Sequence, residues 1–176
     1  MTDSPDGQLA IGEALAKASA YLAAHPDEAR YTDSVAVASL DEGLRVSVEG
    51  PAQEHVTTDM PSSVGGGGSM PSPGWLLRAA IASCVATVAA MRAAQLGLSA
   101  DGLRVEVDSE SDDRGILGVD ESVPAGPLSV RIGISMPSLE HAQLNDVAAW
   151  AVRHCPVSEM LGREVPIRLD LAEVVT

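Results

Sequence analysis

The chain of 176 residues contains two cysteines, Cys84 and Cys155, and these are the residues best suited to chemistry. Neither belongs to a CxxC pair or to the histidine spacing of a zinc site, so we expect no metal. A cysteine protease or acyl transferase would need a nearby histidine oriented by a carboxylate, and none of the four histidines stands in such a context. Two readings remain open: a redox dithiol, or a buried and inert cysteine on an apolar helix.

A reactive thiol must ionise, and the residues next to Cys84 in the sequence offer little that would stabilise its thiolate. It sits far inside an apolar segment, beyond the first turn in which a helix dipole acts. Arg78 would point to the opposite face of a helix, and Arg92 would lie about 12 Å further along its axis. The cation must therefore come from another segment or another subunit. The candidates, in order of preference, are Arg45, Arg30 and Arg153.

The segment around Cys84, from Pro71 to Gly97, predicts one long helix because alanine, leucine and methionine dominate it. Ser72 can cap its N-terminus, and Pro73 suits the first helical position. Gly97 can adopt the left-handed conformation that ends a helix. Apolar residues occur almost all the way round, which is typical of a helix surrounded by protein. The arginines inside the segment would be costly in hydrocarbon, so we interpret it as a core helix and not a membrane span.

The rest of the chain predicts short strands and two amphipathic helices. We expect irregular structure at Met1–Gln8 and a flexible glycine-rich loop at 60–73, without the Gly-Lys-Ser/Thr of a phosphate-binding loop. The expected helices are 9–24, 139–155 and a turn at 158–161. The expected strands are 35–40, 44–48, 55–58, 103–108, 128–135 and a closing strand at 165–171. Hairpins and helices in separate runs indicate an α+β fold with antiparallel sheet.

Composition excludes several classes of partner. The net charge is −14, which argues against binding to nucleic acid and to anionic membrane surfaces. The N-terminus lacks the basic start and apolar core of a signal peptide. Two cysteines do not make a disulfide scaffold, so we expect a cytoplasmic protein with reduced thiols.

Three segments together resemble the OsmC/Ohr family of hydroperoxide-reducing proteins: Gly65-Gly66 to Pro71-Ser72-Pro73, Leu76 to Cys84, and His154-Cys155-Pro156-Val157-Ser158. The resemblance covers roughly Val35–Leu171. It implies antiparallel sheets around a long buried central helix, in an intertwined homodimer with each active site at the interface. Residues 1–30 would be a tail and an extra helix, and residues 31–176 the OsmC-like domain.

The resemblance also implies a reaction. Cys84 would be the peroxidatic thiolate that reduces an apolar or fatty hydroperoxide, Cys155 would resolve its sulfenic acid as a disulfide, and Arg45 is our choice of activating residue. A dithiol reductant, lipoyl-type or a small thiol, would reopen the disulfide, with no cofactor and no metal. The chain departs from the family at Gly74, where other members carry a glutamate. The alternative is a non-catalytic dimer that binds a small apolar ligand.

Overall fold

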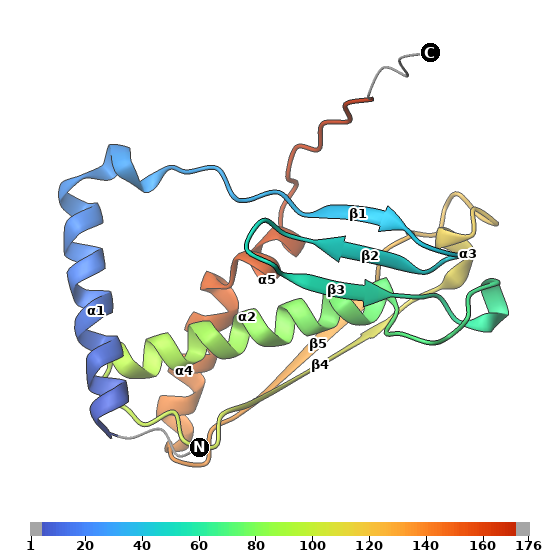
Figure 1. Ribbon diagram of the computed structural model, residues 1–176. Helices are drawn as coiled ribbons and strands as arrows, with labels where there is room; N and C mark the ends of the chain where they lie inside the picture. Colours follow the sequence, from blue (N-terminus) through green and yellow to red (C-terminus); the bar gives the residue numbers. More distant parts are fainter. Residues whose placement is uncertain (1–4, 172–176) are drawn as a thin grey trace.

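The computed structural model describes residues 5–171, which form a mixed α+β structure (Figure 1). The helices are α1 (Pro5–Ala24), α2 (Pro73–Gln95), α3 (Asp113–Ile116), α4 (His141–His154) and α5 (Pro156–Leu161), with 3-10 turns at Pro26–Ala29 and Ser62–Val64. The strands are β1 (Val37–Leu40), β2 (Val46–Glu49), β3 (His55–Thr58), β4 (Arg104–Glu110) and β5 (Ser129–Ser135). The α+β fold class predicted from the sequence is confirmed.

Helix α2 begins and ends where its capping residues predict. The hydroxyl of Ser72 accepts a hydrogen bond from the Trp75 backbone N–H at 3.2 Å, and Pro73 occupies the first turn. Gly97, just past the C-terminus, has a φ of +67°, which glycine adopts without steric cost. The helix therefore carries Cys84 at its centre, held by well-defined ends.

The hydrophobic core lies along one face of α2. Residues at helical spacing on this face are buried: Ile81, Val85, Val88, Ala89 and Ala93. They pack against Val147 and Ala151 of α4 and against the inward side of the β4–β5 hairpin. That hairpin is antiparallel, and its partly buried residues alternate with exposed ones, as its sequence predicts.

The opposite face of α2 is open. Ala80, Ser83 and Thr87, which share that face, are exposed. Because α2 is apolar on all sides, we expected protein to surround it completely. The described residues of this chain pack against only one of its sides. By length and composition alone α2 could also cross a membrane, with a mean hydropathy of 1.6, a property that core helices of soluble proteins share.

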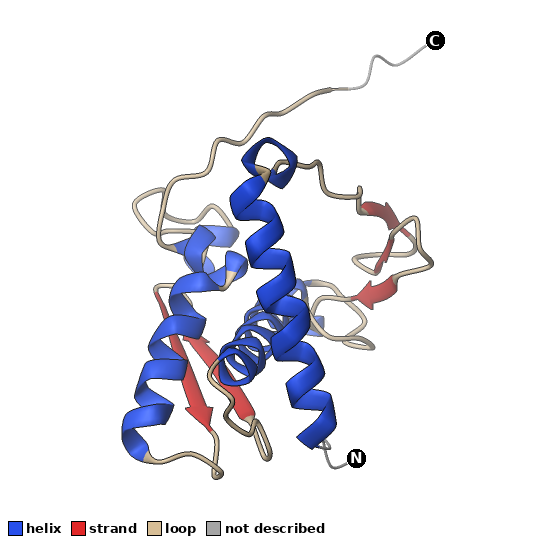
Figure 2. Cartoon of the chain, turned by 90° about the vertical axis from the view of Figure 1, so that its left-hand side faces the viewer, coloured by secondary structure: helices blue, strands red, loops and turns tan. Residues whose placement is uncertain are grey.

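Strands β1–β3 form a second antiparallel sheet, in the order β1-β2-β3, on the other side of α2 from β4 and β5 (Figure 1). Figure 2 shows α2 nearly end-on, between this sheet and the remaining strands. All four residues of β1 are exposed, and within residues 5–171 β1 pairs only with β2. The sheet thus has an open edge, whose unpaired backbone groups can accept another strand.

The predicted closing strand, 165–171, is wrong for the single chain: this segment follows α5 without regular structure. Its apolar residues alternate as in a strand, yet Ile167 is 93 % exposed and Leu169 is 82 % exposed. Alternation favours an extended backbone, but a strand also needs a neighbour to hydrogen-bond with. In the part of the chain that the structure describes, no strand pairs with this segment.

Helix α1 crosses the C-terminal end of α2 (Figure 1). The two backbones approach closely at Gly12, where an added Cβ would lie 2.8 Å from the Ala94 carbonyl oxygen, so a larger residue would force them apart. Because α1 begins at Pro5, the prediction of irregular structure was wrong for residues 5–8. Residues 1–4 lie outside the described part of the chain.

The glycine-rich segment before α2 is an ordered loop, not the flexible linker we expected. Asp59, which is 3 % exposed, accepts hydrogen bonds from the backbone N–H groups of Met60, Gly67 and Ser69 and from the Ser69 hydroxyl. Its own N–H donates to the Pro71 carbonyl at 3.1 Å, which closes the loop. These bonds, the Ser69 N–H foremost, hold the pKa of Asp59 below its usual value. The carboxylate fixes the path into α2.

We expect the Asp59→Asn variant to be less stable than the wild type at neutral pH. Since the pKa of Asp59 is lower in the folded protein, its stabilisation is present above the unfolded pKa and is lost as pH falls through the folded pKa. The difference in free energy of unfolding between the wild type and Asp59→Asn should therefore disappear as pH falls below about 4. Urea unfolding over a pH series measures it, with the exposed Asp101→Asn as control. A difference that persists in acid would contradict this role.

Candidate functional site

The two cysteine side chains meet between α2 and α5, although 71 positions separate them in the sequence. Cys84 is partly exposed, whereas Cys155 is fully buried in the core. Both are free thiols, and they are close enough for each to affect the pKa of the other. Spacing alone did not place them together, and only the family resemblance implied that they are neighbours.

The fold around Cys155 explains its orientation. Helix α4 ends at His154, and the extended backbone of Cys155 turns the chain into α5, where Pro156 takes the first position. Cys155 is thus the N-cap of α5, and its Sγ accepts a hydrogen bond from the Ser158 N–H at 3.4 Å. Cysteine is not among the usual capping residues, so sequence reasoning missed both this cap and Ser158.

The two thiols have different acidities. Burial raises the pKa of Cys84, and its hydrogen bond to Cys155 raises it further, against a smaller opposite effect of the Val157 N–H. Burial also acts to raise the pKa of Cys155, but hydrogen bonds from Cys84 and Ser158 outweigh it and leave that pKa below its usual value.

Cys84 receives no help from a cation within residues 5–171, since burial and neighbouring hydrogen bonds account for its pKa. Arg78 donates to the Ser109 hydroxyl at 3.3 Å. Arg92 pairs with Asp146 at 3.1 Å and lies over the Trp150 ring. The arginines of α2 are thus engaged elsewhere.

Arg45, our preferred activating residue, lies on the β1–β2 hairpin immediately before β2. Its backbone closes the turn with Asp41 and Glu42. Its half-buried side chain forms no ion pair or hydrogen bond with the described residues, and it does not contribute to the pKa of Cys84. Arg30 and Arg153 are exposed. The single chain brings the two cysteines together but not an arginine to either of them.

The chemistry open to two neighbouring thiols is disulfide formation and thiol–disulfide exchange. Cys84 is partly exposed to solvent and lies beside the buried Cys155. Among residues 5–171 no three His, Cys, Asp or Glu side chains gather as metal ligands would.

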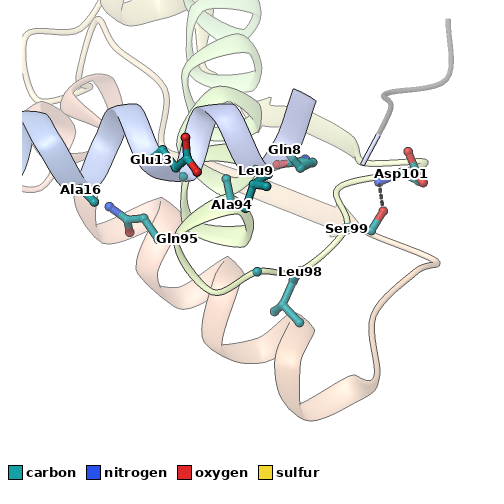
Figure 3. Close-up of a pocket in the computed structure, with 11 residues that line it drawn as sticks. Gln8, Leu9, Glu13, Ala16, Ala94, Gln95, Leu98, Ser99 and Asp101 are labelled. Carbon is teal, nitrogen blue, oxygen red and sulfur yellow. Dashed lines mark hydrogen bonds between the residues drawn. The ribbon is translucent and has the colours of Figure 1, made fainter. Parts of the chain in front are cut away.

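A separate pocket of about 670 Å³ lies between the first half of α1 and the C-terminal end of α2 (Figure 3). Leu9 and Ala16 of α1 lie on one side of it and Ala94 of α2 on the other, and Gln8, Glu13 and Gln95 add polar groups. Ala94 is ten residues beyond Cys84, which places the pocket about 15 Å along the helix axis from the thiols. It is distinct from the site of the two cysteines.

Solved structures show the same fold. An OsmC-like protein from Mycoplasma pneumoniae has a TM-score of 0.64 and 15 % identity, covering 76 % of this chain and 89 % of its own. The organic hydroperoxide resistance protein OsmC from Legionella pneumophila has a TM-score of 0.56 and 18 % identity, covering 75 % and 90 %. An organic hydroperoxide resistance protein from Elizabethkingia anophelis has a TM-score of 0.60 and 16 % identity, covering 74 % and 88 %.

The search of curated proteins found no match. The family model described as OsmC-like protein matches residues 66–170, which is more than half of the chain and includes α2, both cysteines and α5. The chain belongs to the OsmC-like protein family.

Proposed function

We propose that this protein is a thiol-dependent peroxidase that reduces organic hydroperoxides through Cys84 and Cys155. The observation that carries the proposal is the contact between a partly exposed sulfur and a buried one. The family membership supports a peroxide-related role, because solved structures with this fold are named organic hydroperoxide resistance proteins.

The proposed cycle uses the exposure of the two sulfurs. Cys84, the reachable one, attacks the terminal oxygen of the hydroperoxide as a thiolate. The O–O bond breaks, the terminal hydroxyl stays on Cys84 as a sulfenic acid, and the remaining alkoxide takes up a proton and leaves as an alcohol. Cys155, held against it, then displaces the sulfenic hydroxyl and forms a disulfide. A dithiol reductant, of lipoyl type or a small thiol, restores both thiols. No cofactor or metal takes part in this scheme.

Apolar or fatty hydroperoxides are the substrates that suit the surroundings of Cys84. Leu77 and Val157 are partly buried against the same core as Cys84. The whole chain has no phenylalanine and only two tryptophans and two tyrosines, so its pocket walls must be largely aliphatic. Such walls favour an apolar organic group over hydrogen peroxide itself.

We expect a stoichiometric amount of cumene hydroperoxide to remove two thiols per chain, because one turnover ends in the disulfide. Cys84→Ser should lose none, and Cys155→Ser should lose one as sulfenic acid. Thiol counting after the reaction measures this, with Ser129→Ala, an exposed strand residue, as control. If both wild-type thiols persist, catalysis is excluded and the fold alone remains.

We also propose that the protein is a homodimer. Three surfaces of the described chain lack cover: the small-residue face of α2, the open edge of β1, and the alternating apolar residues of segment 165–171. A second copy can supply what these surfaces lack. Segment 165–171 has the alternation of a strand but no neighbour among the described residues, and β1 is an edge strand that could accept one. The same copy covers α2.

We expect Ile167→Asp with Leu169→Asp to convert a dimer into monomers of 18.1 kDa, since both side chains are exposed in the single chain and would be buried by pairing. Sedimentation analysis measures the mass. The matched control is Arg168→Ser with Asp170→Ser, which changes the alternate face of the same segment. A wild-type protein that is already monomeric would disprove the dimer.

Arg45, in this proposal, activates Cys84 of the partner subunit. It is a half-buried arginine without a counter-ion among residues 5–171, on the hairpin of β1 and β2, which lies to one side of its own α2 (Figure 1). A guanidinium beside Cys84 would offset the burial that raises the pKa of that thiol.

Heterodimers test this arrangement. A dimer of one Arg45→Ala chain and one Cys84→Ser chain should keep one working site, because the intact Cys84 and the intact Arg45 meet across the interface. A dimer of wild type with the double variant should have none. Peroxidase assays on differently tagged, co-purified pairs measure both. The reverse pattern would place Arg45 beside its own Cys84, and full activity of the Arg45→Ala homodimer would transfer the role to Arg30 or Arg153.

The alternative is a non-catalytic dimer that binds a small apolar ligand. The pocket between α1 and α2 favours it, because its volume lies in the range of ligand sites and its lining is largely apolar. Persistence of both thiols after peroxide, together with binding of an apolar fluorescent probe, would support this function instead.

A further inference from the structure

Cys155 is the single residue between α4 and α5, so the joint between these helices decides where its sulfur lies. On the α4 side, the Cys155 N–H donates to the Ala151 carbonyl at 2.9 Å. On the α5 side, the Glu159 N–H donates to the Cys155 carbonyl at 2.9 Å. The backbone of Cys155 thus belongs to both helices, and any change in the angle between them would move its side chain.

The hydroxyl of Ser158 fastens this joint. It donates from the first turn of α5 to the Val152 carbonyl in the last turn of α4, at 2.7 Å, and lies 3.3 Å from the Cys155 carbonyl oxygen. The Val152 carbonyl needs such a donor, because the residue four places on is Pro156, which has no N–H. The serine hydroxyl therefore replaces the helix bond that the proline removes.

Ser158 also contacts the sulfur itself, through its backbone. Its N–H donates to the Cys155 Sγ at 3.4 Å. The Cys155 side chain is fully buried, and α5 packs against α2, which carries Cys84. The hydroxyl of Ser158 thus fixes the angle between the helices, while its N–H fixes the direction of the sulfur between them.

We propose that Ser158 is a positioning residue for disulfide formation, whose hydroxyl holds α5 on α4 so that the Cys155 sulfur stays beside Cys84. The inference rests on the proposed function and concerns its second step. In that step the Cys155 sulfur bonds to the sulfur of the Cys84 sulfenic acid, the S–O bond breaks, and the hydroxyl leaves with the Cys155 proton as water. Fixing the joint raises the effective concentration of one sulfur at the other.

Neighbouring side chains do not duplicate this connection. Within residues 5–171 no ion pair and no other side-chain hydrogen bond runs from α5 to α4. The next residue of α5, Glu159, pairs with Arg163 beyond the end of that helix. Glu159→Gln therefore changes the same helix without touching the joint, and it serves as the matched control.

The position of Cys155 can be tested without peroxide, by equilibrating the full-length protein with reduced and oxidised dithiothreitol and counting the remaining thiols. Threonine and valine have nearly the same shape, so Ser158→Thr and Ser158→Val differ mainly by a hydroxyl. We expect Ser158→Val to lower the equilibrium constant for the Cys84–Cys155 disulfide about fivefold, the usual effect of losing one hydrogen bond. Ser158→Thr and Glu159→Gln should match the wild type. Equal constants for the threonine and valine variants overturn the proposal, as does a wild type that forms no disulfide.

A single turnover with cumene hydroperoxide separates positioning from general damage to the structure. Ser158→Val should form the Cys84 sulfenic acid at the wild-type rate but close the disulfide about fivefold more slowly, so that a trapping probe captures more sulfenic acid. An equally slowed first step would contradict a role confined to positioning Cys155. A wild type that ignores the hydroperoxide but forms the disulfide with dithiothreitol would disprove the proposed function, while the threonine and valine variants still decide the role of Ser158.

Discussion

The contact between α2 and α5, which makes the two thiols neighbours, is the constraint around which this structure is organised. It requires the middle of α2 and the N-terminus of α5 to stay in contact, although they are far apart in the chain. The core residues of α2 and α4 keep α2 in place, and the turn at Cys155 and Pro156 aims α5 at it. Helix packing thus keeps two soft, polarisable groups next to each other.

Local sequence signals determined what could be predicted. The ends of α2 follow from Ser72, Pro73 and Gly97, because capping depends on residues next to the helix. Strands β4 and β5 follow from alternation on a half-buried sheet. The strand at 165–171 has the same alternation, but the single chain offers it no neighbour, so a correct local pattern gave a wrong element.

The features that the sequence did not predict depend on contacts between residues that are far apart in the chain. Asp59 resembles any loop carboxylate until the fold brings the N–H groups of Gly67 and Ser69 onto it. The pairing of Cys84 with Cys155 came from the family resemblance and not from their spacing. The position of the activating cation stayed a prediction, because the nearest candidates are engaged elsewhere or belong to surfaces that a second chain would meet.

In the proposed cycle, the complete burial of Cys155 decides which sulfur of the disulfide a reductant can attack. In a disulfide between these sulfurs, an incoming reductant thiolate can approach only the side of Cys84, since the other sulfur has no exposed surface. Cys155 is then always the leaving group, and the donors of α5 that stabilise its anion speed its departure. The mixed disulfide formed on the way carries the reductant on α2, and the buried sulfur is spared from side reactions with other thiols in its surroundings.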